Sequence, residues 1–260
     1  MTRPVRDEAE LVSSRRVARD TWWQEYRSPE IAAAARPGQF VMLGLGLDKP
    51  GTWLLPRPFS VGWRSDDGRI GILLRVFGRG TRALSGLVPG DRALVLGPLG
   101  TAFQAEPDRM TECVAGGVGL APFIFLAADR FAGGHPTRLI YGERDAGAVF
   151  DMELLTSLTG VEPEIYTEDG SAGRQGRVTA GLEATSNATI CACGPTPMLV
   201  ALARFAKENG RDLQVSVEEH MGCGIGTCQG CVVRSAEGRW MKACIEGPVF
   251  RARDLDWGAP

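Results

Sequence analysis

The chain has 260 residues, of which 44% are hydrophobic and 23% charged, and its formal net charge is −2. This balance is typical of a globular protein long enough for two domains and a small module. The small charge without a basic patch excludes nucleic acid as an expected partner, and apolar runs broken by Gly, Pro or charge exclude a membrane span.

Residues 1–106 are predicted to form an antiparallel β-barrel. Their short apolar runs, separated by Gly, Pro and Asp turns, cover residues 39–45, 57–63, 68–78 and 91–99. Many short strands at this spacing are typical of such a barrel. Trp22 and Trp23 are expected to pack inside it.

Residues 107–210 change to strands that alternate with helices. The predicted strands cover 110–117, 137–143, 162–168 and 188–194, and the predicted helices cover 121–132, 152–158 and 196–209. Alternation of this kind predicts a doubly wound parallel sheet. Cys113 and Cys191 fall in its buried strands and are expected to be small core residues. With residues 211–260 as a small C-terminal module, the expected fold class is α+β multidomain.

Two motifs in the barrel predict a phosphate-binding pocket. The first motif consists of Arg57, Pro58, Phe59 and Ser60. The proline fixes the local backbone, the guanidinium of Arg57 can pair with a phosphate, and the hydroxyl of Ser60 can hydrogen-bond a flavin ring edge. Gly80 and Thr81 stand at a predicted helix start, where backbone N–H groups bind anions. Each motif alone is also compatible with an ordinary barrel turn.

Two loops of the α/β part predict a dinucleotide site. Gly116, Gly117 and Gly119 follow the first strand and let a pyrophosphate approach a helix N-terminus. Cys193, Gly194 and Pro195 follow a later strand and open another helix. Ligands of such sheets bind at the carboxyl ends of the strands, where both loops converge. A tight strand–helix turn is the alternative. Because the motif is not G-x-G-x-x-G, the rule of a downstream ribose-binding acid does not transfer to Glu143.

Four cysteines dominate the C-terminal module, with the spacing Cys223-x4-Cys228-x2-Cys231-x12-Cys244. Three thiolates in one Gly-rich loop and a later fourth are the plant-type ligand pattern for a [2Fe–2S] cluster. Zinc is the alternative, although the second C-x2-4-C knuckle is missing. No secretory leader is predicted, so disulfides are disfavoured and a cytoplasmic location is expected. A Rieske centre needs a second histidine near His220, which the sequence lacks.

The motifs together resemble the ferredoxin-reductase-like flavoproteins. RPFS, GRGT, AGGVGLAP, CGPTPM and the cysteine module with EGPVF occur in the order of that family. Within it, PGQFVML, YTEDGSAGRQG and EEHMGCGIGTCQGCVV resemble the electron-transfer subunits of NAD-linked dihydroorotate dehydrogenases. The resemblance spans about residue 10 to residue 250.

The resemblance implies FAD in the barrel, NAD(H) on the α/β domain and a [2Fe–2S] cluster at the C-terminus. It places Arg57 at the FAD phosphate, Ser60 by the isoalloxazine, and Gly80 and Thr81 at the pyrophosphate. Gly116, Gly117 and Gly119 would face NAD, with Cys193 and Gly194 near the nicotinamide. It also implies a separate FMN-containing subunit that oxidises dihydroorotate to orotate for pyrimidine biosynthesis, two copies of each subunit assembling together.

The cofactors carry this chemistry, so no catalytic acid–base residues are expected in this chain. Glu168 and Asp169 would repel a 2′-phosphate and favour NAD over NADP, while Arg174 and Arg177 lie near enough in sequence to oppose this. Two alternatives stay open: the flavin subunit of another complex, such as a sulfhydrogenase or a ferredoxin-dependent transhydrogenase, or a zinc-binding interaction module.

Overall fold

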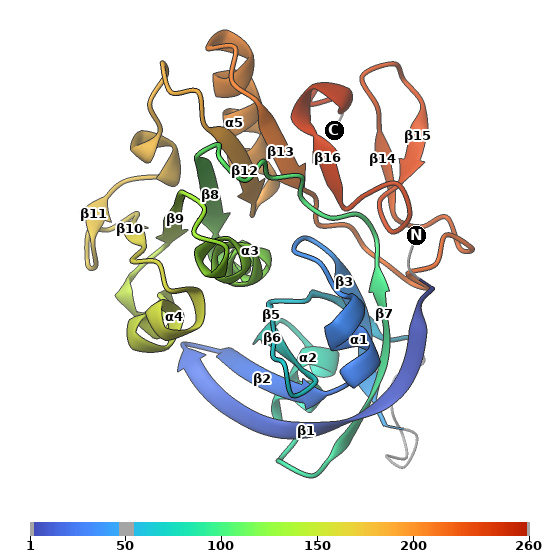
Figure 1. The fold of residues 1–260 in the computed structure, drawn as a ribbon. Coiled ribbons are helices and arrows are strands. Elements are labelled where there is room, and N and C mark those ends of the chain that lie inside the picture. Colours follow the sequence, from blue (N-terminus) through green and yellow to red (C-terminus); the bar gives the residue numbers. More distant parts are fainter. Residues whose placement is uncertain (1–2, 47–54, 259–260) are drawn as a thin grey trace.

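In the computed structural model, which describes residues 3–46 and 55–258, the chain folds around two seven-stranded sheets and a small hairpin. Figure 1 shows the first sheet curling beneath the second, with the C-terminal segment beside both. None of the helices in the described residues is long and apolar enough to cross a membrane.

The first sheet is antiparallel throughout and runs in the order β4-β3-β7-β1-β2-β6-β5. Its strands are β1 (Val5–Ala18), β2 (Thr21–Arg27), β3 (Phe40–Leu45), β4 (Arg57–Ser60), β5 (Trp63–Arg64), β6 (Arg69–Arg75) and β7 (Arg92–Leu99). Two short helices, α1 (Pro29–Ala34) and α2 (Arg79–Ser85), pack against it. The long β1 bends around the outside and turns the sheet into an open barrel (Figure 1).

The second sheet has the order β11-β10-β9-β8-β12-β13-β16, and β16 alone pairs antiparallel. Its strands are β8 (Thr111–Gly116), β9 (Thr137–Glu143), β10 (Glu164–Thr167), β11 (Arg174–Gln175), β12 (Thr189–Cys193), β13 (Leu213–Ser216) and β16 (Val249–Arg251). Its helices are α3 (Ala121–Ala132), α4 (Met152–Thr159) and α5 (Thr196–Glu208), joined by 3₁₀ turns η1 (Gly117–Leu120), η2 (Ala146–Ala148) and η3 (Val178–Gly181).

The parallel sheet has a separate apolar core on each face. Along β8, Val114 packs in one core with α5, whereas its neighbours Cys113 and Ala115 pack in the other with α3. Side chains of a strand alternate between its faces, so helices are needed on both sides. This arrangement and the antiparallel barrel confirm the predicted fold class. Cys113 and Cys191 are fully buried, as predicted.

The remaining elements belong to the C-terminal segment. They are the hairpin of β14 (Val232–Arg234) and β15 (Trp240–Lys242) and the 3₁₀ turn η4 (Ala252–Asp254). The segment is not separate from the rest of the chain, because β13 before the hairpin and β16 after it both lie in the parallel sheet. The cysteine loop between β13 and β14 is therefore anchored at both ends.

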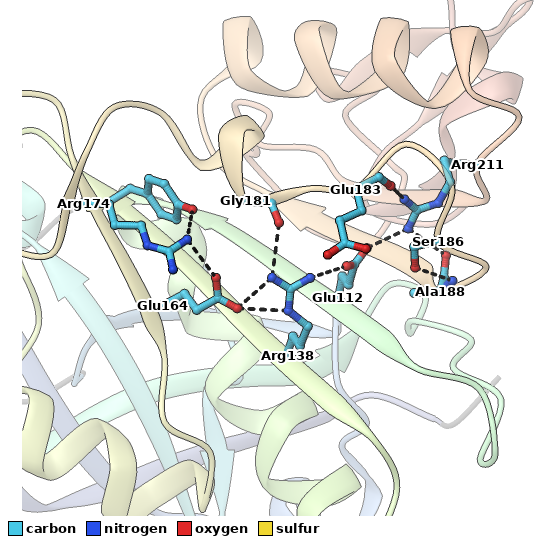
Figure 2. Close-up of polar contacts among 10 residues, drawn as sticks. Glu112, Arg138, Glu164, Arg174, Gly181, Glu183, Ser186, Ala188 and Arg211 are labelled. Atoms are coloured by element: carbon cyan, nitrogen blue, oxygen red, sulfur yellow. Dashed lines mark hydrogen bonds and ion pairs between the residues drawn. The ribbon is translucent and has the colours of Figure 1, made fainter.

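A buried ion network joins the first residues of the parallel strands (Figure 2). Glu112 at the start of β8 accepts from Arg138 of β9 at 2.7 Å and from Arg211, just before β13, at 2.6 Å. The side chains of Glu112 and Arg211 are 2% and 3% exposed. This network lies at the edge opposite the predicted nucleotide loops, so it belongs to the scaffold.

Glu112→Gln is expected to lower the free energy of unfolding by about 3–5 kcal/mol, because it leaves two guanidinium groups around a neutral amide. Glu237→Gln breaks an exposed pair with Arg239 and is the matched control, with an expected loss below about 1 kcal/mol. Denaturant unfolding followed by fluorescence measures both values. Equal losses in the two variants would contradict a scaffold role for the network.

Candidate functional site

A crevice of about 960 Å³ opens where the barrel, the parallel sheet and the cysteine loop meet. Its barrel wall comes from strand β4 and the turn before α2, and its opposite wall from η1 and the end of β12. The third wall is the segment from β13 to the cysteine loop. Of the predicted site residues, it is lined by Arg57, Pro58, Phe59, Ser60, Gly80, Thr81 and Cys193.

Arg57 and Gly80 form the cationic end of the crevice. A Cβ at Gly80 would lie 3.4 Å from Nη2 of Arg57, which places the guanidinium directly beside the start of α2. The Nη1 of Arg57 donates to the carbonyl of Leu55 at 2.5 Å, which holds the group in place. This is a suitable environment for a phosphate.

The hydroxyl of Thr81 hydrogen-bonds the local backbone. It accepts from the backbone N–H groups of Phe77 and Gly78 at 2.9 and 3.1 Å and donates to the carbonyl of Gly78. The side chain therefore shapes the turn before α2. A contact of Thr81 with a phosphate would have to come from its backbone.

The two glycine-containing loops of the parallel sheet touch each other. A Cβ at Gly119 would lie 2.2 Å from the carbonyl oxygen of Cys193, and one at Gly116 would lie 3.0 Å from Cδ of Pro195. Gly194 also packs against Gly116. Glycine is therefore required at these positions because the two loops pack closely, a constraint that the sequence pattern did not reveal. Gly116, Gly117, Gly119, Gly194 and Pro195 support the crevice without lining it.

Carboxylates on the third wall were not predicted. Glu218 follows β13 and lines the crevice as an exposed residue; the crevice walls partly shield its carboxylate from water and raise its pKa, which the nearby Arg75 partly opposes. Burial also raises the pKa of the Cys193 thiol, as does the negative charge of Glu218, so Cys193 is a neutral wall residue. The strand-like run at 212–220 gave no such signal, because β13 ends at Ser216 and the residues that follow it line the crevice consecutively, without the alternation of a strand.

The cysteine loop forms the edge of the same crevice. Met221, Gly222 and Gly230 line it, and Gly224 packs against the barrel. Cys231 and Cys244 are buried, Cys223 is half-buried and Cys228 is exposed. One end of the loop therefore faces solvent while the other faces the protein interior.

The four thiols are arranged as two pairs. Burial would raise the pKa of Cys223, but hydrogen bonds from the backbone N–H groups of Cys228 and Ile225 and from the Cys228 thiol lower it to about 7. Burial and a hydrogen bond with Cys231 raise the pKa of Cys244 to about 12. Across residues 3–46 and 55–258, no three metal-binding side chains converge on one point. Two thiol pairs, built from three thiols of the loop and from Cys244 just after β15, fit a centre with two irons.

The fold and this crevice define a ferredoxin-reductase-like flavoprotein with an iron–sulfur module. A chain of an NADH-dependent reduced ferredoxin-NADP oxidoreductase superposes with a TM-score of 0.85 at 28% identity, covering 96% of this chain and 90% of that one. The ferredoxin reductase in carbazole 1,9a-dioxygenase shares the fold, with a TM-score of 0.68 at 22% identity over 80% of this chain and 67% of that one.

The family model of the iron-sulfur cluster binding domain of dihydroorotate dehydrogenase B matches residues 218–256. The dihydroorotate dehydrogenase B (NAD(+)) electron transfer subunits of Desulforamulus reducens and Geobacillus thermodenitrificans are 34% and 38% identical to this chain. Each alignment covers 96% of this chain and 98% of the relative. The chain belongs to the family of dihydroorotate dehydrogenase B electron transfer subunits.

Gly224→Ala is expected to loosen the cysteine loop. Gly224 has φ +72°, and a Cβ there would lie 2.5 Å from Cγ of Met42. Gly238→Ala is the control: its φ of +81° imposes similar backbone strain, about 1–2 kcal/mol, but its Cβ would meet nothing closer than 3.7 Å. Iron content per chain should fall in the first variant and hold in the second. Equal iron content in both would contradict the packing argument.

Proposed function

We propose that this chain carries electrons from a partner subunit to NAD⁺ through a [2Fe–2S] cluster and FAD, while the partner oxidises dihydroorotate to orotate for pyrimidine biosynthesis. One observation carries the proposal: the barrel motif, the nucleotide loops and the cysteine loop all border a single crevice. Family membership supports the substrate. In this scheme the chain is the NAD-linked oxidoreductase subunit and supplies no acid–base residue of its own.

The barrel side of the crevice fits FAD. Its volume is at the upper end for cofactor sites, and it joins an arginine-lined end to apolar side chains such as Phe40 and Leu73. Arg57 would pair with a phosphate, Gly80 and Thr81 would hold the pyrophosphate through their backbone, and Pro58, Phe59 and Ser60 would border the isoalloxazine. A flavin exchanges electron pairs with NAD and single electrons with an iron–sulfur cluster.

The opposite wall fits a nicotinamide nucleotide. Gly116, Gly117 and Gly119 would border NAD, and Cys193, Gly194 and Pro195 would border its nicotinamide end. Asp169 follows β10 and accepts from the hydroxyl and N–H of Ser171, which lowers its pKa and keeps it charged. Such a carboxylate repels a 2′-phosphate. Arg174 donates to the hydroxyl of Tyr166 at 3.2 Å and lies 3.9 Å from a carboxylate oxygen of Glu164, so both groups compete with a 2′-phosphate for its guanidinium.

The cysteine loop and Cys244 fit the cluster: Cys223 and Cys228 would bind one iron, and Cys231 and Cys244 would bind the other. The exposed Cys228 would mark the side from which a partner delivers electrons. The partner would be an FMN-containing catalytic subunit, in an assembly of two copies of each chain. We also propose that residues 1–106, 107–210 and 211–260 are the FAD, NAD and cluster domains and that the protein works in the cytoplasm, where its seven cysteines stay reduced.

Reconstitution with an FMN-containing dihydroorotate dehydrogenase subunit tests the proposal. Anaerobically purified chain should show flavin bands with broad iron–sulfur absorbance and should co-purify with that subunit. The complex should form orotate and NADH together from dihydroorotate and NAD⁺. A colourless, zinc-loaded chain would reject the electron-transfer role and support a zinc-binding interaction module.

A second candidate is the flavin subunit of another complex, such as a ferredoxin-dependent transhydrogenase or a sulfhydrogenase. The likeness to the NADH-dependent reduced ferredoxin-NADP oxidoreductase favours the former. The two candidates are distinguished by adding dihydroorotate to the reconstituted complex described above. Failure of dihydroorotate to reduce the cluster, with NADH-driven flavin reduction intact, would reject the pyrimidine assignment and leave the second candidate.

Cys228→Ser is expected to abolish electron transfer from the partner to NAD⁺ while NADH-driven dye reduction through FAD largely survives. Cys228 lies at the exposed side of the loop, beyond the step between NADH and flavin. Parallel assays of the two activities on one preparation make the comparison. Equal loss of both would contradict a cluster outside the NADH-to-FAD step.

A further inference from the structure

An ion pair between Arg75 and Glu143 joins the barrel to the parallel sheet. Arg75 ends β6 and lines the crevice, and Glu143 ends β9. Their side chains are 20% and 4% exposed. Each has a further anchor in its own sheet: Nε of Arg75 donates to Oγ1 of Thr21 at 3.1 Å, and the hydroxyl of Tyr141 donates to Oε1 of Glu143 at 3.1 Å.

Glu143 also contacts the two segments that would hold NAD. A Cβ at Gly117, which has φ +59°, would lie 3.5 Å from Nη1 of Arg75 and 3.9 Å from Oε1 of Glu143. The carbonyl oxygen of Glu143 accepts from the N–H of Glu168 at 3.2 Å. The ion pair thus lies directly behind the glycine turn and at the base of the acidic loop.

The pair differs from the other ion pairs across the same contact. The pairs Arg15–Asp151, Arg19–Asp145 and Arg64–Asp129 also join barrel to parallel sheet, but their arginine side chains are 37–56% exposed. Exposed pairs contribute little, whereas breaking a buried pair leaves an uncompensated charge. Among these pairs, Arg75–Glu143 is the most buried, and its arginine lines the crevice, so its loss would change the crevice itself.

The contacts of Glu143 give a physical reason why the rule of a downstream ribose-binding acid does not apply to it. Its Oε1 accepts from both Arg75 and Tyr141, and the side chain is 4% exposed. The tyrosine is itself fixed, since its hydroxyl accepts from the N–H of Phe150 at 3.3 Å. A carboxylate held this way is poorly placed to bind a sugar hydroxyl in solvent.

We propose that Arg75 and Glu143 are positioning residues for the nicotinamide: their ion pair sets the spacing between the flavin wall and the glycine turn. This inference rests on the proposed function of the crevice. Neither residue exchanges electrons or protons with substrate. Hydride transfer requires the reacting atoms to lie within about 3–3.5 Å, so a small change in this spacing alters NADH use far more than it alters folding.

Glu143→Gln in the full chain tests the proposal. It keeps the shape of the side chain and removes the charge that holds Arg75. We expect the KM for NADH in dye reduction to rise about tenfold and the long-wavelength charge-transfer absorbance with NAD to weaken, with FAD and iron content unchanged. Arg15→Gln breaks an exposed pair across the same contact and should match the wild type. A wild-type KM and charge-transfer band in Glu143→Gln would overturn the proposal.

The double variant Arg75→Met/Glu143→Gln distinguishes an effect on nicotinamide positioning from an effect on stability. It also replaces the single variant if that variant does not fold. Removing both charges leaves no buried ion without a partner, so the melting temperature should return toward the wild type. The KM for NADH should stay raised. Recovery of KM together with melting temperature would show a purely structural pair and overturn the proposal. A wild-type chain that binds FAD but cannot oxidise NADH would instead reject the proposed function itself.

Discussion

The crevice and the position of the cysteine loop both depend on the contact between the curled antiparallel sheet and the parallel sheet. Trp23 of β2 sits at its centre, edge-on to Phe150 with ring centroids 6.2 Å apart. A Cβ at Gly71 of β6 would lie 2.2 Å from the Trp23 ring. The glycine therefore leaves the space in which the indole lies while it packs against residues of the parallel sheet. Because one wall of the crevice comes from each sheet, the site exists only while this contact holds.

The C-terminal segment is attached to both sheets at that contact. The N–H of Thr101, on the stretch that joins barrel to parallel sheet, donates to the carbonyl of Gly247 at 2.7 Å, and its hydroxyl donates to Val249 at 3.0 Å. Gly224 meets the barrel on the other side. These contacts anchor the segment that carries the thiols beside the crevice, as a route for single electrons requires.

Local patterns were enough to predict much of this arrangement. Cysteine spacing and glycine content identified the cluster loop, and the change in strand and helix rhythm located the two sheets. Glu143 and Arg75 could not be paired in this way, since 68 residues separate them and only the packing of the sheets brings them together. The motif around Thr81 was found in the sequence, but the role of its hydroxyl was not, because a hydroxyl in the first turn of a helix can bond the local backbone as readily as a ligand. Trp23 is buried as expected, at the contact between the sheets as well as within the barrel, whereas its neighbour Trp22 is only half-buried.

Anaerobic addition of NADH to the isolated chain, followed by visible absorbance and electron paramagnetic resonance, tests the central claim most directly. If one crevice connects nicotinamide, flavin and cysteine loop, the flavin bands should bleach and the signal of a reduced [2Fe–2S] cluster should appear without any partner present. Bleaching of the flavin with a cluster that stays oxidised would contradict a continuous route through this chain.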